Sequence, residues 1–334
     1  MVMTMNTDPS AGDDVRNGFP AGYSVTRTWN TRSQRPVIID LWYPAIPSSK
    51  AIPHDYGFGR GMVAEGAGPA RGNFPVILLS HGAFGAARNY SWIAEYLARK
   101  GYIVAGVSHF GESWVYGPGT IDPVVASAPW LRPPDCTAAL DFILGAASPA
   151  GASADPDRIG ALGHSSGGAT VIALGGAVYD PASMDRYCRS KDSVNDKGCS
   201  YGDPGTPPPH ADEAILSYRD PRVRKIVALD PALGPGYTAP GLAGMTVPVL
   251  VVGAVGNDFL PFEHHAAHYA RHIPGASLVQ LNDGEGHFVF LDTCHSDQSA
   301  AGIPLCRDRP GVDRDRVHRY LRETIAGFFD ESFG

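Results

Sequence analysis

Short apolar runs alternate with segments of helical periodicity along most of this 334-residue chain. The apolar runs lie at 23–28, 36–43, 75–80, 102–107, 158–162, 225–229, 249–252 and 278–281. Such an alternation is typical of a mostly parallel sheet that is covered by helices. The pattern therefore predicts an α/β fold with a central sheet of about eight strands and helices on both of its faces.

Five segments carry the helical pattern. They are 90–100, 136–144, 169–174, 262–272 and a closing helix that presents Val317, Leu321, Ile325 and Phe328 on one face. Gly101 directly follows the first of these segments, at a position where glycine commonly ends a helix. We expect each of the first four helices to connect two strands of the sheet.

Three stretches interrupt this alternation. Residues 45–73 are rich in Pro, Gly and Ala and are predicted to be a surface connection. Residues 110–134 form a loop rich in Gly, Pro and aromatic residues. Residues 179–222 are rich in Pro, Gly, Asp and Tyr, with a short helix expected at 211–218. We interpret them as a cap-like insertion between the helix at 169–174 and the strand that follows it.

The composition fits one large domain. Apolar residues make up 43% of the chain, which is enough to bury a large core. We expect residues 1–20 to be a flexible arm and residues 21–334 to form a single α/β domain. The formal net charge is −7 and there is no basic run, so nucleic acid is not an expected partner. No apolar run approaches the roughly 20 residues that would span a bilayer.

The six residues Gly163-His164-Ser165-Ser166-Gly167-Gly168 indicate a reactive serine. Read as G-x-S-x-G, they lie between a predicted strand and a predicted helix, and Ser165 is the expected nucleophile. The strand turns abruptly into the helix, so the residues two before and two after the serine must lack bulk. Both are glycine. Ser166 is the competing candidate, but a frame centred on it would place the side chain of His164 where glycine is needed.

A serine hydroxyl needs an imidazole to take its proton, and the imidazole needs a carboxylate that fixes its tautomer. Of the twelve histidines, His287 follows the last predicted strand, which is where the base lies when the chain order is serine, acid, histidine. The acid is left open between two residues. Asp230 ends one strand and Asp258 follows the next, and either carboxylate can reach a histidine in that loop.

The oxyanion site is expected at two backbone amides. Ala83 follows His81-Gly82 at the end of a predicted strand, and Ser166 follows the nucleophile, so their N–H groups are the natural pair to stabilise developing negative charge. Phe84, Trp114 and Tyr116 are candidate substrate-binding residues, because they lie in the loops where an acyl or alcohol pocket would form.

No metal or organic cofactor is expected. His264, His268 and His272 share one face of a predicted helix, a spacing that metal sites use, but the H-E-x-x-H pattern would need glutamate at position 265. That position holds His265, and we interpret the set as the polar face of an amphipathic helix.

The five cysteines bear on the compartment. The pairs Cys188/Cys199 and Cys294/Cys306 each bracket a polar loop, while Cys136 lies in a helical pattern. The start of the sequence has no apolar signal segment, so the cytoplasm is the default expectation. If both pairs are disulfides and a signal has been removed, the protein is periplasmic or secreted.

Taken together, these residues resemble the α/β-hydrolase superfamily. Within it, the chain resembles the bacterial dienelactone-hydrolase-like proteins that are related to platelet-activating factor acetylhydrolase. The resemblance covers residues 36–330 and rests on Leu41-Trp42-Tyr43-Pro44, Leu79-Ser80-His81-Gly82, Gly163 to Gly168, Leu229-Asp230-Pro231 and Gly286-His287-Phe288. True dienelactone hydrolases use a cysteine nucleophile, and this chain has Ser165 in its place, so dienelactone cleavage is not expected.

The resemblance also bears on the acid. Most α/β-hydrolases carry it after the strand that corresponds to 249–252, where Asn257 stands at the usual carboxylate position and Asp258 is one residue late. Acetylhydrolases of the platelet-activating-factor type carry an Asp after the preceding strand, and Asp230 matches that arrangement. The resemblance thus favours Asp230, with Asp258 as the alternative.

The expected activity is hydrolysis of a small-molecule carboxylic ester, with short-acyl esters favoured, through an acyl-enzyme on Ser165. An acyltransferase, an amidase or a peptidase could use the same triad, and a non-catalytic binding protein on this fold is the remaining alternative. The sequence leaves the oligomeric state open.

Overall fold

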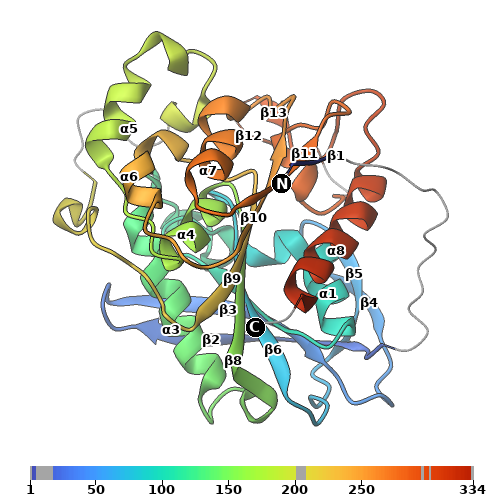
Figure 1. Cartoon of the computed structure of the whole chain (residues 1–334). Helices are drawn as coiled ribbons and strands as arrows, with labels where there is room; N and C mark the ends of the chain where they lie inside the picture. The colour runs from blue at the N-terminus through green and yellow to red at the C-terminus, as the bar shows by residue number, and fades with distance from the viewer. Residues whose placement is uncertain (1, 5–17, 201–207, 295–296, 301, 332–334) are drawn as a thin grey trace.

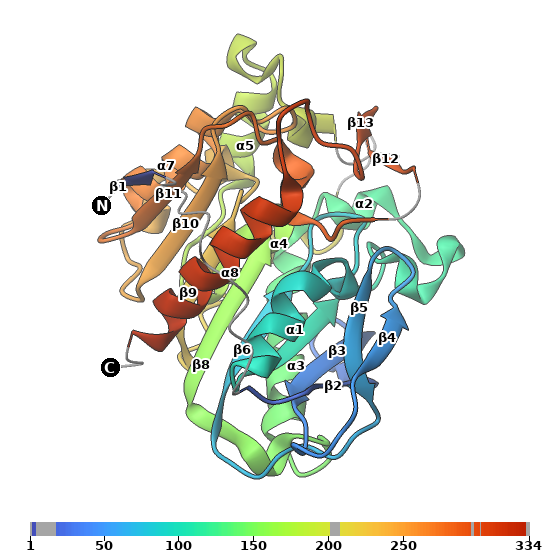
Figure 2. The same cartoon turned by 90° about the vertical axis from the view of Figure 1, so that its right-hand side faces the viewer.

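The computed structural model describes residues 2–4, 18–200, 208–294, 297–300 and 302–331. Within these residues a sheet of eleven strands crosses the molecule in the order β1-β11-β10-β9-β8-β6-β7-β3-β2-β5-β4. Helices cover both faces of the sheet (Figures 1 and 2). The expected α/β fold is confirmed.

Eight neighbouring strands of this sheet correspond to the eight predicted apolar runs. They are β2 (Ala21–Asn30), β3 (Arg35–Pro44), β6 (Phe74–Ser80), β7 (Ile103–Ser108), β8 (Ala154–His164), β9 (Val223–Leu229), β10 (Val249–Ala254) and β11 (Ser277–Leu281). From β7 through β6, β8, β9 and β10 to β11, all neighbours run parallel, whereas β3 is antiparallel to both β2 and β7. The loops that follow the parallel strands therefore meet at one edge of the sheet, where ligands of such folds bind.

Three strands extend the sheet beyond the prediction. They are β1 (Val2–Thr4), β4 (Ile52–Asp55) and β5 (Arg60–Glu65). Strand β1 pairs in parallel with β11, so this part of the expected flexible arm is ordered by the sheet. Strands β4 and β5 form an antiparallel edge hairpin inside the stretch expected to be a surface connection. Most of their residues are exposed or half-buried, so they lack the continuous apolar run that marks a buried strand.

Helices of the two faces belong to two separate cores. The first core takes residues from α3 (Arg132–Leu144), α4 (Ser166–Leu174) and α7 (Ala266–His272), and the second from α1 (Ser91–Arg99) and α8 (Arg314–Asp330). Helices α1 and α8 lie side by side in front of the sheet in Figure 2. On α8 the buried aromatic residue is Phe329 rather than the expected Phe328, since position 329 lies one full turn after Ile325.

The insertion is built from short helical turns. Its described elements are α5 (Pro181–Cys188), η6 (Lys191–Ser193), η7 (Lys197–Ser200) and η8 (Ala211–Glu213), the last in place of the longer helix expected at 211–218. Two further short α-helices of the described residues, α2 (Pro123–Ala126) and α6 (Ala239–Leu242), lie in loops. Residues 201–207 of the insertion lie outside the described residues.

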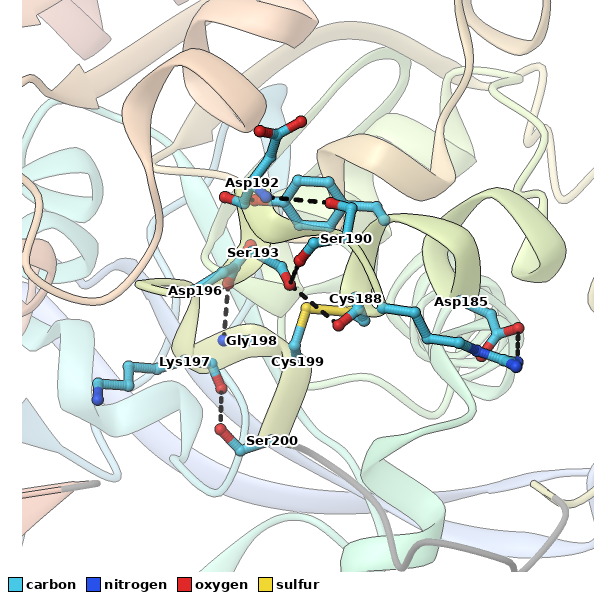
Figure 3. Close-up of a disulfide and its surroundings, with 12 residues drawn as sticks. Asp185, Cys188, Ser190, Asp192, Ser193, Asp196, Lys197, Gly198, Cys199 and Ser200 are labelled. Carbon is cyan, nitrogen blue, oxygen red and sulfur yellow. Dashed lines mark hydrogen bonds and ion pairs between the residues drawn. A yellow bond between two sulfur atoms is a disulfide. The ribbon is translucent and has the colours of Figure 1, made fainter.

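Both cysteine pairs are disulfides. Cys188 is bonded to Cys199 within the insertion (Figure 3), and Cys294 is bonded to Cys306 in the segment before α8. Cys136 is a buried free thiol. Two disulfides in one chain are typical of extracellular or secreted proteins. Among the helices of the described residues, none has the length and apolar character to cross a membrane.

Candidate active site

Ser165 lies in a strained turn between β8 and α4. Its backbone has φ 55° and ψ −121°, a conformation that a residue with a side chain rarely adopts. A methyl group at Gly163 would lie 2.1 Å from the carbonyl oxygen of Gly167, and one at Gly167 would lie 2.0 Å from that of Ser80. The two flanking glycines are therefore a steric requirement of the turn.

The carboxyl edge of the sheet brings Ser165 next to an acid–histidine pair. The backbone N–H of Ser165 donates to the carbonyl of Leu229 (3.0 Å), so the turn lies beside the end of β9, where Asp230 follows. Nδ1 of His287 lies 2.6 Å from Oδ2 of Asp230, and both side chains are buried. All three residues thus come from loops at the same edge.

Asp258 has a different position from Asp230. Its Oδ1 accepts a hydrogen bond from the backbone N–H of His287 (3.1 Å), and its Oδ2 lies 3.4 Å from the guanidinium of Arg309. Asp258 therefore contacts the main chain of His287, while the imidazole ring of His287 pairs with Asp230.

Asp230 is held by two further donors. The backbone N–H of Ala254 donates to its Oδ1 (3.2 Å), and the side-chain amide of Asn257 donates to its Oδ2. Burial raises the pKa of the Asp230 carboxyl, and these two hydrogen bonds act in the opposite direction. Asn257, which occupies the usual acid position of the superfamily, here donates to Asp230, which follows the preceding strand.

Two rings pack against the imidazole of His287. The ring of Phe259 is stacked on it, with centroids 5.0 Å apart and an interplanar angle of 12°, and the ring of His164 lies 4.6 Å away. Burial lowers the pKa of His287 to about 3, which favours the neutral imidazole. With Nδ1–H donating to Asp230, the lone pair on Nε2 is the one that can accept a proton.

The two amides expected to bind an oxyanion border Ser165. Ser166 is the first residue of α4, and the first bond of that helix runs from the N–H of Ala169 to the carbonyl of Ser165 (3.1 Å), so the N–H of Ser166 precedes the helical bonds. A methyl group at Gly82 would lie 3.2 Å from Cβ of Ser165. The turn that contains Ala83 therefore lies directly against the serine.

A buried hydrogen-bond chain connects the three segments of the site. The hydroxyl of Tyr90 accepts from the N–H of Gly82 (3.0 Å) and lies 2.8 Å from Nδ1 of His164. On its other side, Nε2 of His164 lies 3.0 Å from the carbonyl oxygen of His287. Tyr90 therefore donates to Nδ1 and His164 donates from Nε2. Sequence reasoning missed Tyr90, because nothing in its helical segment distinguishes it from a core residue.

The candidate substrate-binding residues differ in their surroundings. Phe84 lies in the oxyanion turn with φ 59°. Trp114 is 37% exposed, and its indole N–H donates to Asn89 (3.3 Å). The hydroxyl of Tyr116 is bonded to the backbone carbonyl of Ser108 (2.8 Å), so this side chain fastens its loop to β7. Of the two candidates in the 110–134 loop, Trp114 is thus more accessible than Tyr116.

The histidines at 264, 268 and 272 do not lie on one continuous helix. The expected helix over 262–272 is divided into η10 (Phe262–His264) and α7, because the backbone breaks at His265 (φ −119°, ψ −95°). Among the described residues, no group of three or more His, Cys, Asp or Glu side chains is placed to hold a metal ion.

Comparisons with known proteins agree with this geometry. A sequence model of the family described as Chlorophyllase matches residues 66–184, a segment that contains both the oxyanion turn and the serine turn. Among solved structures, the ferulic acid esterase from Streptomyces cinnamoneus has a TM-score of 0.63 at 23% sequence identity, over 96% of this chain and 91% of that one. No curated protein sequence matches the chain.

The structural match therefore confirms the expected α/β-hydrolase fold, and the family match supports an enzyme that hydrolyses carboxylic esters. The narrower resemblance to dienelactone-hydrolase-like and acetylhydrolase proteins stays a prediction.

Proposed function

We propose that this protein is a serine carboxylic-ester hydrolase with Ser165 as nucleophile, His287 as base and Asp230 as its orienting acid. The observation that carries the proposal is the strained, glycine-flanked Ser165 beside the end of β9, where the Asp230 carboxylate lies 2.6 Å from Nδ1 of His287.

The reaction begins when Oγ of Ser165 attacks the ester carbonyl carbon and its proton passes to Nε2 of His287. The carbonyl oxygen becomes an oxyanion and accepts hydrogen bonds from the amides of Ala83 and Ser166. The C–O bond then breaks, and the alcohol leaves with the proton from His287. A water molecule attacks the acyl-enzyme by the same route and releases the carboxylic acid. Each oxyanion donor contributes about 3 kcal/mol to transition-state stabilisation.

We propose short-acyl esters as substrates. The described part of the insertion consists of short turns that carry many Asp, Ser and Lys residues, and it offers no continuous apolar cover of the kind that long acyl chains require. The structural neighbour is a ferulic acid esterase, so a feruloyl ester belongs in the substrate panel. Acyl transfer and amide cleavage are tested by product analysis with alcohol acceptors and amide substrates.

The two disulfides favour the hypothesis that the protein functions in an oxidising compartment. We propose that the protein acts outside the cytoplasm. Counting thiols in denatured protein purified without reductant checks this proposal: one free thiol, from Cys136, is the expected result, and five would contradict it.

Covalent labelling tests the nucleophile. The protein is incubated with a fluorophosphonate, and the modified peptide is identified by mass spectrometry. We expect a single adduct on Ser165, with none in Ser165→Ala and normal labelling in Ser80→Ala. Ser80 is the matched control, because its hydroxyl is hydrogen-bonded to His109, which is paired with Asp135. An unlabelled Ser165, or full esterase activity in Ser165→Ala, would contradict the proposed function.

A further inference from the structure

The cap-like insertion docks onto the loop that packs against the imidazole of His287. We call residues 188–199, which the Cys188–Cys199 disulfide closes, the cystine turn (Figure 3). Within it, the backbone N–H of Lys197 donates to the carbonyl of Phe259 (2.9 Å). Phe259 is the residue whose ring is stacked on His287. The cystine turn therefore reaches His287 through one intervening residue, Phe259.

Phe259 is fixed at both ends of its backbone. Its N–H donates to Oδ1 of Asn257 (2.8 Å), and its carbonyl accepts from Lys197. The same Asn257 donates its side-chain amide to Asp230. Asn257 therefore connects the backbone of Phe259 to Asp230, and the contact with Lys197 connects it to the insertion.

A buried hydrogen bond between Asp196 and His265 fastens the cystine turn to the same loop. Oδ2 of Asp196 lies 2.6 Å from Nε2 of His265, and neither side chain is more than 2% exposed. Nδ1 of His265 accepts from the N–H of Gly234 (3.2 Å), so its Nε2–H donates to Asp196. The other carboxylate oxygen of Asp196 accepts from the N–H of Gly198 (2.8 Å; Figure 3). A hydrogen bond to a buried carboxylate is stronger than one between neutral groups.

The disulfide fixes the geometry of these contacts. Cys199 directly follows Gly198 and is bonded to Cys188 at the end of α5, 11 residues earlier. The hydroxyl of Ser193 also bonds the carbonyl of Cys188 (2.9 Å), as Figure 3 shows. Closing a short loop removes much of its conformational freedom, so Asp196 and Lys197 are presented in one arrangement.

We propose that the cystine turn is a positioning element for the catalytic base, and that it acts through Phe259. This inference rests on the proposed role of His287. A displaced Phe259 would let the imidazole rotate away from Ser165 while Asp230 stays in place. Displacements of about 1 Å at a catalytic group can lower turnover by about 10²-fold.

The second disulfide supplies a matched control. Cys294 and Cys306 close a loop of nearly the same size, with a separation of 12 residues. Between His287 and that loop, the carboxylate of Asp292 accepts from the backbone N–H groups of Ser91 (3.0 Å) and Trp92 (2.8 Å). The segment that follows His287 is thus anchored to α1 before Cys294 is reached. Removing the Cys294–Cys306 disulfide is therefore expected to leave His287 in place.

The experiment compares Cys188→Ser/Cys199→Ser with Cys294→Ser/Cys306→Ser, using a chromogenic short-acyl ester well below both melting temperatures. We expect the first pair to lower kcat about tenfold with KM within about twofold, and the rate of fluorophosphonate labelling to fall by the same factor. The second pair is expected to lower the melting temperature with kcat unchanged. Equal kcat in the two pairs, or an unchanged kcat in the first, would overturn the proposal.

Two variants with an intact disulfide keep the test decisive if the first pair does not fold. Asp196→Asn removes the charge but keeps the shape, and Phe259→Leu removes the stacked ring. Both are expected to lower kcat severalfold at constant KM, and wild-type kcat in both would contradict the positioning role. The outcome is separate from the proposed function, because absence of a Ser165 adduct in the wild-type protein rejects that function whatever the cysteine variants do.

Discussion

Two sets of serine, histidine and aspartate side chains lie near the carboxyl edge of the sheet. They are Ser165, His287 and Asp230 in the candidate site, and Ser80, His109 and Asp135 beside it. In the second set Nδ1 of the histidine lies 2.8 Å from the aspartate and its Nε2 lies 3.0 Å from the serine hydroxyl. The second set has both side-chain connections of a catalytic triad, and the first has the histidine–aspartate pair (2.6 Å) with the Ser165 turn beside it.

The backbone separates the two serines. Ser80 is the last residue of β6 and pairs regularly with Val107 of β7 and Gly163 of β8. Ser165 lies in the strained turn, at the first amide of a helix and against the oxyanion turn. A reactive serine needs space for an acyl group and donors for an oxyanion, and a serine inside a sheet has neither.

The two sets also differ in the charged groups that surround them. Asp135 is paired with the guanidinium of Arg35 at 2.5 Å, and Asn30 donates to it as well (2.7 Å). Burial alone would raise the pKa of Asp135, but Arg35 and His109 hold it below its ordinary value. Burial and the nearby Arg132 lower the pKa of His109 to about 3. The second set is therefore a closed, fully buried network that connects β3, β6, β7 and α3.

The largest expected effect separates the two serines. Ser165→Ala should lower kcat by about 10⁵- to 10⁶-fold, because it removes the nucleophile. Ser80→Ala should change kcat less than about fivefold and should lower the free energy of unfolding by about 1–3 kcal/mol, because Nε2 of His109 is left without its donor. Steady-state kinetics and urea unfolding of both variants measure these quantities. Comparable losses of kcat would show that the buried set takes part in catalysis.

The two candidate acids come next. Asp230→Asn should lower kcat about 10⁴-fold, since an amide at that position favours the wrong tautomer of His287. Asp258→Asn should lower kcat less than about tenfold, because Asp258 contacts the backbone N–H of His287 and not its imidazole ring. The comparison is made at matched stability, and the larger loss in Asp258→Asn would exchange their roles.

The sequence predicted the parts of this site that depend on local pattern. Continuous apolar runs identify the eight inner strands, and glycine spacing identifies Ser165 because the turn excludes Cβ atoms at two positions. Chain order predicts His287 as the base, and that role stays a prediction. Chain order does not decide between Asp230 and Asp258, because both follow strands that precede His287, and only the folded structure shows that the imidazole lies beside Asp230.

The buried network could not be read from the sequence. Its members lie on different elements, and Arg35 and Asp135 are 100 residues apart. Each residue has an unremarkable local pattern, and only the packing of α3 against β3 and β7 brings them together. The edge strands β4 and β5 escaped prediction for a related reason. Strand β5 pairs with β2 and β4 pairs with β5, so both depend on pairing rather than on their own hydrophobicity.

A charge deletion should affect stability rather than turnover. Arg35→Met leaves the buried Asp135 carboxylate without its cation and is expected to lower the free energy of unfolding by about 3–5 kcal/mol. Arg316→Met is the exposed control, since its pair with Asp283 is solvent-accessible on both sides and is expected to contribute about 0–1 kcal/mol. Urea unfolding measures both. A loss of kcat in folded Arg35→Met would connect the buried network to the chemistry.

The smallest expected effect is a shift of the pH profile. The reaction needs neutral His287, and burial lowers its pKa below the ordinary value of 6.5, so activity should persist below pH 6.5 and be lost only as the pH falls towards the lowered pKa. His109→Gln should leave the acidic limb of kcat/KM unmoved, because His109 does not exchange a proton with substrate. If the wild-type activity is lost at or above pH 6.5, the negative charge of Asp230 outweighs the effect of burial on the pKa of His287. If the acidic limb of the profile moves in His109→Gln, His109 is the titrating group.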